Sequence, residues 1–216
     1  MRIEIVCSDR THPVWPRLEA WVLAARDLHD AALVTSSRDL VGGDLLFLVS
    51  CGEHIGAEIR ARYRTTLVLH ASDLPEGRGW SPHIWQILEG RRDLCVSLLE
   101  AADPVDSGPI WAQVRFTLEG HELHDEISEK VITAELHLIS EVVDGAVGGD
   151  PRPQADRTST YYRRRTPEDS RVDPAQSLES QFDMIRVADP DRYPAFFELR
   201  GHRYLIKVIK ADDEPS

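Results

Sequence analysis

Cysteine is scarce in this chain of 216 residues, and the three that occur, Cys7, Cys51 and Cys95, lie in or beside short apolar runs. None belongs to a Cys-x-x-Cys pair, so the sequence offers neither a disulfide framework nor a cysteine-based zinc site. Long apolar runs are also missing, since no stretch approaches the ~18 residues of a membrane span. The N-terminus reads as a strand and lacks the features of a signal peptide. We therefore expect a cytoplasmic protein without membrane contact.

Positive charge is the next deficit. Lys and Arg number 25 against 37 Asp and Glu, which gives a formal net charge of −12. Because nucleic-acid-binding proteins present a basic footprint, we expect no nucleic-acid partner. A small anionic ligand remains compatible, since a local cluster of arginines suffices for it. The length suits one large domain, or one domain with a small extension.

Short apolar segments alternate with helical segments along the first half of the chain. This alternation predicts an α/β fold with a mostly parallel, twisted, Rossmann-like sheet flanked by helices. In such a sheet, ligands bind beyond the carboxyl ends of the strands. The expected strands lie at 2–7, 31–35, 44–50, 65–70, 94–99 and 110–118, and the expected helices at 13–28, 55–63 and 81–88.

The second half of the chain has a different organisation. Its longest helical pattern spans 121–147 and is stopped by Gly148-Gly149. A polar, proline-containing stretch, a short helix and a hairpin follow, at 150–160, 177–187 and 195–209. We therefore divide the chain into a main domain, a linker and a small C-terminal extension made of a helix and a hairpin, at 1–149, 150–160 and 161–216.

Two loops carry the candidates for chemistry. His70 ends an apolar strand, where a histidine is well placed for proton transfer, although a strand-end histidine that bonds a backbone carbonyl is the commoner case. The loop from Glu100 to Gly108 follows the next strand, so we expect it at the same edge of the sheet. Asp103 and Asp106 in this loop could orient the imidazole or take a proton. The same residues are also good turn formers.

Taken together, these loops resemble the folate-dependent formyltransferases. The pattern HxSxLPxxRGxxPxxW runs from His70 to Trp85, and DxGxIxxQ runs from Asp106 to Gln113. The resemblance covers the main domain and implies an α/β fold that moves a formyl group from 10-formyltetrahydrofolate to an amine. It implies His70 and Asp106 as the catalytic residues, with no metal ion and no covalent enzyme intermediate.

The resemblance also implies where the two substrates bind. The pterin would enter between two loops, with contacts at Ser50, Cys51, His54, Ala101, Ala102 and Asp103. The amine substrate would meet Ser72, Arg78, Gly79 and Trp80, and Trp80 either stacks on a ring or serves in packing. In this scheme Asp106 helps to remove the amine proton and holds His70, which hydrogen-bonds the developing oxyanion.

The tail narrows the resemblance to one branch of the family. The segments YRRRTPEDS (162–170) and MIRVADPDRYPAFF (184–197) resemble those of sugar-nucleotide N-formyltransferases, such as the domain acting on UDP-4-amino-4-deoxyarabinose. An amino-sugar nucleotide is the implied partner, and the arginines 163–165 either meet its pyrophosphate or form a solvated charge run. A tRNA-directed enzyme would carry a longer, basic C-terminal domain. Aromatic residues in the tail leave a core or a homodimer contact open, namely Phe196, Phe197 and Tyr204.

One position departs from the family pattern. The motif is Asn-x-His, and Val68 stands where the asparagine amide would stabilise the oxyanion, a donor whose loss can cost ~10²–10³ in rate. The candidates for a substitute donor are Ser50, His54, Ser72, His83 and a backbone N–H. Two alternatives therefore stay open: a non-catalytic folate or nucleotide binder, and a formyl-folate hydrolase. His121 and His124 lack a third ligand, so we expect no metal site.

Overall fold

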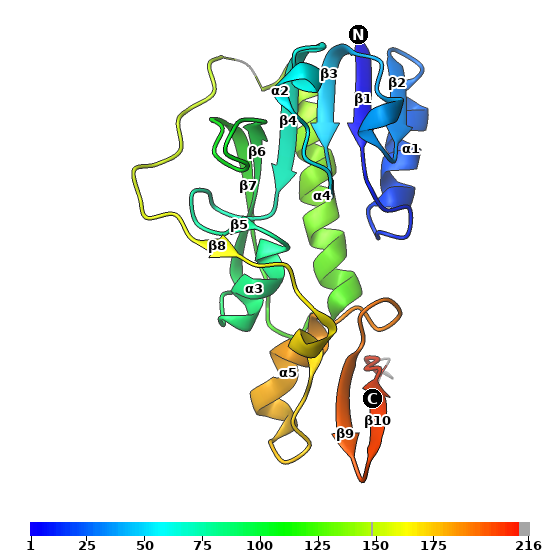
Figure 1. The fold of residues 1–216 in the computed structure, drawn as a ribbon, viewed down its shortest axis with the longest axis vertical. Coiled ribbons are helices and arrows are strands. Elements are labelled where there is room, and N and C mark those ends of the chain that lie inside the picture. Colours follow the sequence, from blue (N-terminus) through cyan, green and yellow to red (C-terminus); the bar gives the residue numbers. More distant parts are fainter. Residues whose placement is uncertain (148, 212–216) are drawn as a thin grey trace, which may run out of the picture.

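The computed structural model describes residues 1–147 and 149–211, so part of the predicted Gly148-Gly149 helix stop and the end of the predicted extension lie outside the described residues. Its centre is a six-stranded sheet in the order β2-β1-β3-β4-β6-β7 (Figure 1). The four strands from β2 to β4 are parallel, which confirms the mostly parallel α/β fold. The strands are β1 (Arg2–Val6), β2 (Asp30–Val34), β3 (Gly43–Leu48), β4 (Tyr63–His70), β6 (Asp93–Glu100) and β7 (Ile110–Thr117).

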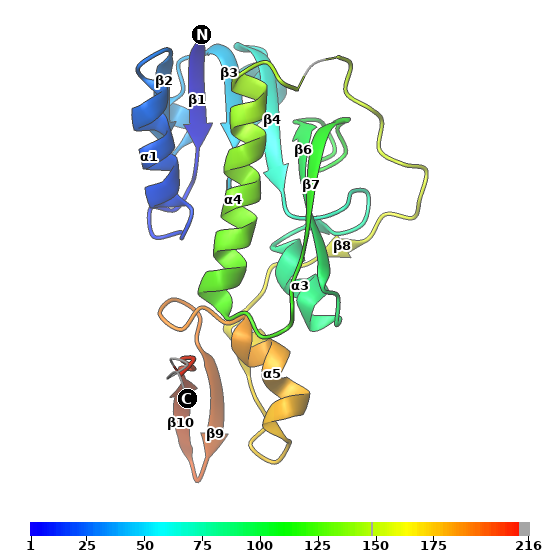
Figure 2. The same cartoon turned by 180° about the vertical axis from the view of Figure 1, so that it is seen from behind.

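Helices cover the sheet because its strands are apolar on both faces. α1 (Trp15–Ala25) and α4 (His124–Val143) lie together on one face (Figure 2). Their apolar stripes bury Leu18 and Leu138 against Phe47 in the main core. The remaining helices are α2 (Ala57–Arg60), α3 (Pro82–Leu88) and α5 (Leu178–Arg186). In the part of the chain that the structure describes, no helix is long and apolar enough to cross a membrane.

The strand after His70 runs in the direction opposite to the one that the alternation predicts. β6 is antiparallel to β4, with His70 opposite Ser97 and Leu67 opposite Glu100. A parallel return would need a crossover to the other edge of the sheet. The chain instead stays at the carboxyl edge through the short helix α3 and enters β6 from there (Figure 1). The predicted reason for placing the 100–108 loop beside His70 is therefore wrong, because β6 ends away from that edge.

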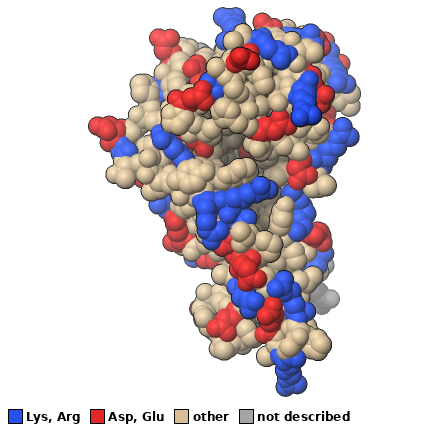
Figure 3. Space-filling model, in the orientation of Figure 1, with Lys and Arg blue, Asp and Glu red and all other residues tan. Residues whose placement is uncertain are grey.

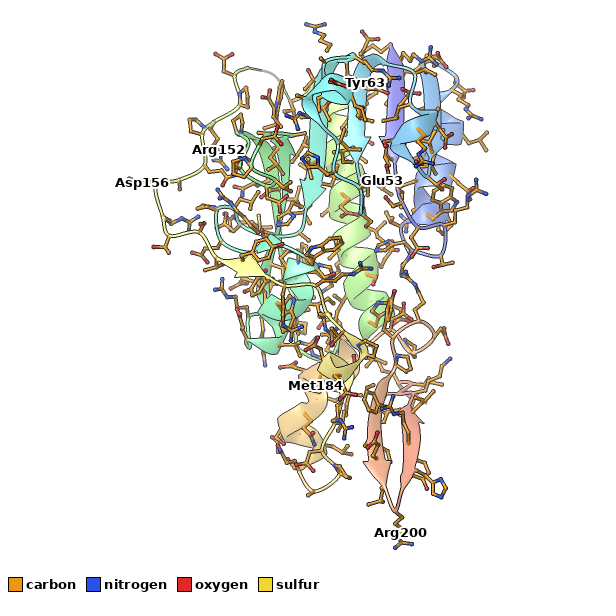
Figure 4. All side chains as sticks on the ribbon, viewed as in Figure 1. Glu53, Tyr63, Arg152, Asp156, Met184 and Arg200 are labelled. Atoms are coloured by element: carbon orange, nitrogen blue, oxygen red, sulfur yellow. The ribbon has the colours of Figure 1, made fainter. Side chains whose placement is uncertain are left out.

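The segment predicted as a linker is tied to the six-stranded sheet at one end and leads into a separate two-stranded pair at the other. Arg152 exchanges backbone hydrogen bonds of 2.7 and 2.9 Å with Ile110. The chain then swings outward past Asp156, which Figure 4 shows at its outer reach. It returns as β8 (Tyr161–Tyr162), which pairs in parallel with β5 (Arg78–Gly79). This β5–β8 pair connects the loop after His70 to the tail.

The tail forms the predicted helix and hairpin. α5 and the hairpin of β9 (Ala195–Leu199) and β10 (His202–Ile206) lie below the sheet (Figure 1). Val172, Ile185 and Ala195 belong to a small core of their own. Across the hairpin, the rings of Phe197 and Tyr204 stack at 5.2 Å. Figure 4 places Arg200 at the tip of the hairpin and Met184 on α5.

Candidate functional site

His70 and Asp106 meet at the carboxyl edge of the sheet. His70 ends β4, and its Nδ1 lies 3.7 Å from an oxygen of Asp106. Both residues are buried, at 7 % and 8 % exposure. The structure thus brings together the two residues that the sequence predicts as catalytic, although β6 does not end beside His70. Asp106 reaches His70 because the loop after β6 folds back along the sheet.

Asp106 is held in place by one hydrogen bond to its carboxylate and one to its backbone carbonyl. It has a left-handed backbone, with φ 59°, and its second carboxylate oxygen accepts the Gly79 N–H at 3.0 Å. The side-chain amide of Gln154 donates to the carbonyls of Asp106 and Gly108 at 2.8 and 3.0 Å. Gln154 in turn accepts from Arg78 at 2.8 Å. The predicted linker therefore supplies a residue that fixes the loop of Asp106.

Two glycines make this arrangement possible. A Cβ on Gly79, which has φ 95°, would lie 2.3 Å from the carbonyl oxygen of Tyr162. A Cβ on Gly108 would lie 1.9 Å from the carbonyl oxygen of Glu100. No side chain fits at such distances, so these positions require glycine for the close approach of two backbones.

The imidazole of His70 is engaged on both sides. Its Nε2 lies 2.8 Å from the carbonyl oxygen of Gly77, and because a carbonyl only accepts, Nε2 carries a proton. Nδ1 then faces the Asp106 carboxylate. Two acceptors face each other unless a proton lies between them, so this pair is a place to hold or pass a proton. In this arrangement neither ring nitrogen is free for an oxyanion.

The two loops predicted to hold folate lie against each other. Asp103, in one loop, contacts His54 of the other at 3.3 Å and pairs with Arg60 of α2. These two partners lower the pKa of the Asp103 carboxyl. Ala101 is hydrogen-bonded to the carbonyl of Thr66 at 2.9 Å. His54 and Asp103 are exposed, with side-chain exposures of 63 % and 54 %.

The floor between these loops is apolar. Val68, Ala101 and Cys51 are half-buried and pack against a small buried cluster that contains Leu46 and Leu48 of β3. Ala102 lies beside Gly108. Burial raises the pKa of the Cys51 thiol. Among the described residues, the buried hydroxyl of Thr66 has no partner. Small and apolar groups with a few polar atoms among them are the kind of lining that suits a flat heteroaromatic ring such as a pterin.

The residues predicted to meet the amine substrate are not equally accessible. Ser72 is fully buried, and its hydroxyl has no partner within the described chain. Arg78 and Gly79 belong to β5 and are partly buried. Trp80 is 37 % exposed and lies beneath the guanidinium of Arg164 at 5.0 Å. The accessible member of this set is therefore Trp80.

Two arginines of the triplet 163–165 bind Asp169, and the third does not. Arg163 pairs with Asp169 and covers the Trp85 ring at 4.9 Å. Arg165 donates to the Asp169 carbonyl at 2.9 Å, and burial lowers the pKa of its guanidinium. Arg164 is exposed and, among the described residues, pairs with no carboxylate. Figure 3 shows Lys and Arg side chains gathered midway along this face, beside a hollow.

Sequence reasoning missed two residues around the site, Gln154 and His12. The position of Gln154 in a polar stretch gave no signal. His12 follows β1 and contacts the Ser50 hydroxyl at 3.2 Å. His12 could have been suspected as a histidine beside a turn at the same edge. His83, which the sequence analysis names as a candidate donor, lies on α3 with a buried Nδ1 that has no partner in the described chain, and burial lowers its pKa to about 3.

Two cavities lie elsewhere on the molecule. One, of about 600 Å³, borders β7 and Arg152. The other, of about 780 Å³, lies between the start of α4 and residues 206–210. Neither is lined by His70 or Asp106, which lie buried at the sheet edge. Within residues 1–147 and 149–211, no group of three or more His, Cys, Asp or Glu is arranged to hold a metal ion.

The fold and this buried His–Asp pair define an α/β protein with its site at the carboxyl edge of the parallel strands. Residues 5–143 match the family model described as Formyl transferase, and the chain belongs to this family. Among curated relatives, the methionyl-tRNA formyltransferase of Streptococcus gordonii is 24 % identical over 175 residues, 80 % of this chain and 55 % of the relative. The chain thus spans about half the length of the curated relatives it matches.

Solved structures share the fold. A methionyl-tRNA formyltransferase from Clostridium thermocellum has a TM-score of 0.79 at 22 % identity, over 94 % of this chain and 90 % of that one. HypX from Aquifex aeolicus, in complex with tetrahydrofolic acid, has a TM-score of 0.76 at 20 % identity, over 95 % of this chain and 37 % of HypX. A 4-N formyltransferase from Francisella tularensis has 0.73 at 16 %, over 96 % of each chain.

Proposed function

We propose that this protein transfers a formyl group from 10-formyltetrahydrofolate to the amine of a nucleotide-linked amino sugar. The observation that carries the proposal is the buried pair of His70 and Asp106, 3.7 Å apart at the ligand edge of the sheet. Family membership supports the formyl chemistry. The proposed amino-sugar acceptor is supported by the surface that Trp80 and Arg164 form.

The residues of the pair divide the work of moving a proton. The folate supplies the formyl carbon when it is bound. Asp106, oriented by the Gly79 N–H and by Gln154, faces His70 with one oxygen and can take the proton that the amine loses. His70, anchored on Gly77, keeps its Nδ1 toward that carboxylate. The pair then returns a proton to the departing nitrogen, so the net proton count does not change.

The loops of Cys51 and Asp103 suit the folate. They are cross-connected by His54 and Arg60, and their floor is apolar around Val68. We propose folate contacts at Ser50, Cys51, His54, Ala101, Ala102 and Asp103. No metal ion enters this scheme, since a carboxylate and an imidazole supply the proton transfer.

The acceptor surface is formed by Trp80 and Arg164. An exposed indole beneath a free guanidinium can stack on a base or sugar ring and bond a phosphate. Arg163 and Arg165 are already occupied inside the protein. The net charge of −12 opposes a long phosphate backbone but not a single nucleotide. A structural neighbour named as a sugar N-formyltransferase, from Shewanella and at 14 % identity, shares this fold, and its name supports this acceptor class.

The test is turnover with a panel of acceptors. The protein is incubated with 10-formyltetrahydrofolate and UDP- or dTDP-linked 4-amino sugars, with methionyl-tRNA as a rival acceptor. Release of tetrahydrofolate and the formyl mass gain of the acceptor are both measured. We expect one sugar nucleotide to be formylated, and Arg164→Ala to raise its KM without lowering kcat. Formylation of the tRNA, or release of folate without any formylated acceptor, would replace the proposed acceptor.

A further inference from the structure

We propose that Ser50 is a further catalytic residue, whose hydroxyl donates a hydrogen bond to the formyl oxygen, and that His12 is the positioning residue that aims it. This inference rests on the proposed function, because it concerns the oxygen that acquires charge during formyl transfer. It follows from where Ser50 lies, from what His12 donates to it, and from the engagement of His70 elsewhere.

Formyl transfer needs a donor for an oxyanion. The amine nitrogen forms a bond to the formyl carbon, and the carbonyl electron pair moves onto the oxygen. When that pair returns, the bond from carbon to the folate nitrogen breaks, and this nitrogen leaves with its electrons and gains a proton. A hydrogen bond to the oxygen stabilises the charged stage. His70 does not offer one as it stands, since its Nε2 proton goes to the Gly77 carbonyl at 2.8 Å.

Ser50 lies at the same edge as His70, on the neighbouring strand. β3 and β4 are parallel, with Leu48 opposite Val68. Ser50 comes two residues after Leu48, as His70 comes two residues after Val68, so both follow the same point of the register toward the carboxyl edge. The backbone of Ser50 is left-handed, with φ 47°, so its side chain leaves the regular pleat of β3, which ends at Leu48. The loop behind it is fixed by the Ser8 hydroxyl, which accepts the Gly52 N–H at 2.9 Å.

His12 leaves the Ser50 proton free for another acceptor. The Val14 N–H donates to Nδ1 of His12 at 3.2 Å, so Nδ1 carries a lone pair and the ring proton lies on Nε2. Nε2 is 3.2 Å from the Ser50 oxygen and therefore donates to it. An oxygen that accepts from His12 has its own hydrogen left to donate. Among the described residues, this hydrogen has no acceptor.

The surroundings of His12 keep the ring neutral. Burial is the largest cause, and Arg192 adds to it, so that the pKa of His12 falls to about 4. At neutral pH the imidazole is thus uncharged and has one tautomer. Asp9 opposes this effect but is itself paired with Arg192. A neutral ring fixed by a backbone N–H is a directional donor rather than a general source of charge.

Ser50→Gly is the direct test, because glycine tolerates the left-handed backbone and removes the hydroxyl. We expect kcat for acceptor formylation to fall about 10²-fold, with KM for both substrates within about threefold of the wild type. Ser50→Asn, which also tolerates this backbone and offers an amide donor, should recover part of the loss. Arg200→Gly is the matched control, since Arg200 has φ 52° at the distant hairpin tip.

His12→Asn tests the positioning role. An asparagine side chain can still accept the Val14 N–H two residues on but is too short to reach Ser50. We expect it to lower kcat about tenfold. In the double variant Ser50→Gly/His12→Asn, the second change should add no further loss, because the two residues act as one unit. A merely structural His12 would instead give additive losses.

A readout that needs no turnover is the ¹⁵N spectrum of the His12 ring. We expect a protonated Nε2 and an unprotonated Nδ1 across neutral pH in the full chain. The opposite tautomer would overturn the inference. An unchanged kcat in Ser50→Gly, with a raised KM for the folate, would leave Ser50 with only the folate contact proposed above and would also overturn the inference. In both cases formyl transfer by the wild type would leave the proposed function intact.

The remaining outcomes separate this inference from the function. If the wild type transfers the formyl group only to water, the proposed acceptor is wrong. Attack by water passes through the same oxyanion, so Ser50→Gly must still slow this hydrolysis. If the wild type transfers the formyl group neither to water nor to any amine, both the proposed function and the role of Ser50 are overturned. If the wild type formylates and Ser50→Gly is equally fast, this inference alone is overturned.

Discussion

Glu135 makes the stability of this protein depend on pH. Its side chain lies on the buried face of α4, at 6 % exposure, close enough to Cys7 for its charge to act on that thiol. Burial alone raises the pKa of this carboxyl to about 8, from an ordinary 4.5. We predict that Glu135→Gln removes a specific, calculable part of the pH dependence of unfolding.

The sign follows from where the group ionises. Below the ordinary pKa of 4.5 the carboxyl of Glu135 is protonated in both the folded and the unfolded chain. As the pH rises toward about 8, the unfolded chain ionises first and the folded chain does not. The free energy of unfolding therefore falls over this window, and it levels off above it. At about 1.4 kcal/mol per pH unit, the whole interval is worth about 5 kcal/mol, a large share of the ~5–15 kcal/mol typical of a domain.

Urea unfolding at about pH 5 and about pH 8 measures this contribution. From about pH 5 to about pH 8 the free energy of unfolding should fall by several kcal/mol less in Glu135→Gln than in the wild type, because the amide does not ionise. Glu19→Gln on the exposed face of α1 is the matched control and should follow the wild type. The reasoning is refuted if Glu135→Gln and the wild type lose stability in parallel. The histidines do not confuse the comparison, since all three proteins carry them.

Two further changes test the catalytic loop. Gln154→Leu removes the three hydrogen bonds that hold it, worth ~1 kcal/mol each, and should lower kcat/KM by more than tenfold while Tm drops by a few degrees; a loss of Tm without loss of kcat/KM would contradict a positioning role. Gly79→Ala places a Cβ 2.3 Å from the Tyr162 carbonyl oxygen and should detach β8, seen as faster tryptic cleavage after Arg163. Gly90→Ala is the control, since Gly90 has φ 82° but open space around it. It introduces the backbone strain without the steric clash and should be cleaved like the wild type.

The sequence predicts the parallel half of the sheet well because its strands are short, apolar and separated by helical patterns. It fails at β6, where direction depends on how the chain returns from α3. Hydrophobic periodicity is the same in a parallel and an antiparallel strand, so the pattern carries no direction. The 100–108 loop was placed beside His70 for that wrong reason, and the structure brings it there through a fold-back held by Gln154.

The site shows the same limit. His70 and Asp106 could be predicted because a strand-end histidine and an Asx-rich loop leave a local trace in the sequence, and the family pattern joins them. Gln154 leaves none, since it acts through hydrogen bonds made only in three dimensions, and His12 leaves only the weak trace of a histidine beside a turn. The sequence does not distinguish the three arginines of the triplet, whereas the contacts of Arg163 and Arg165 with Asp169 separate Arg164 from its neighbours.

The most direct measurement is the fate of a ¹³C-labelled formyl group carried by 10-formyltetrahydrofolate, followed by mass spectrometry of the acceptor with wild-type, Asp106→Asn and His70→Asn proteins. The account predicts that the wild type moves the label to the amine of a sugar nucleotide. It predicts that Asp106→Asn and His70→Asn each lose nearly all transfer while still binding the folate. Transfer that survives in Asp106→Asn would contradict the account, because the His70–Asp106 pair would then not carry the reaction.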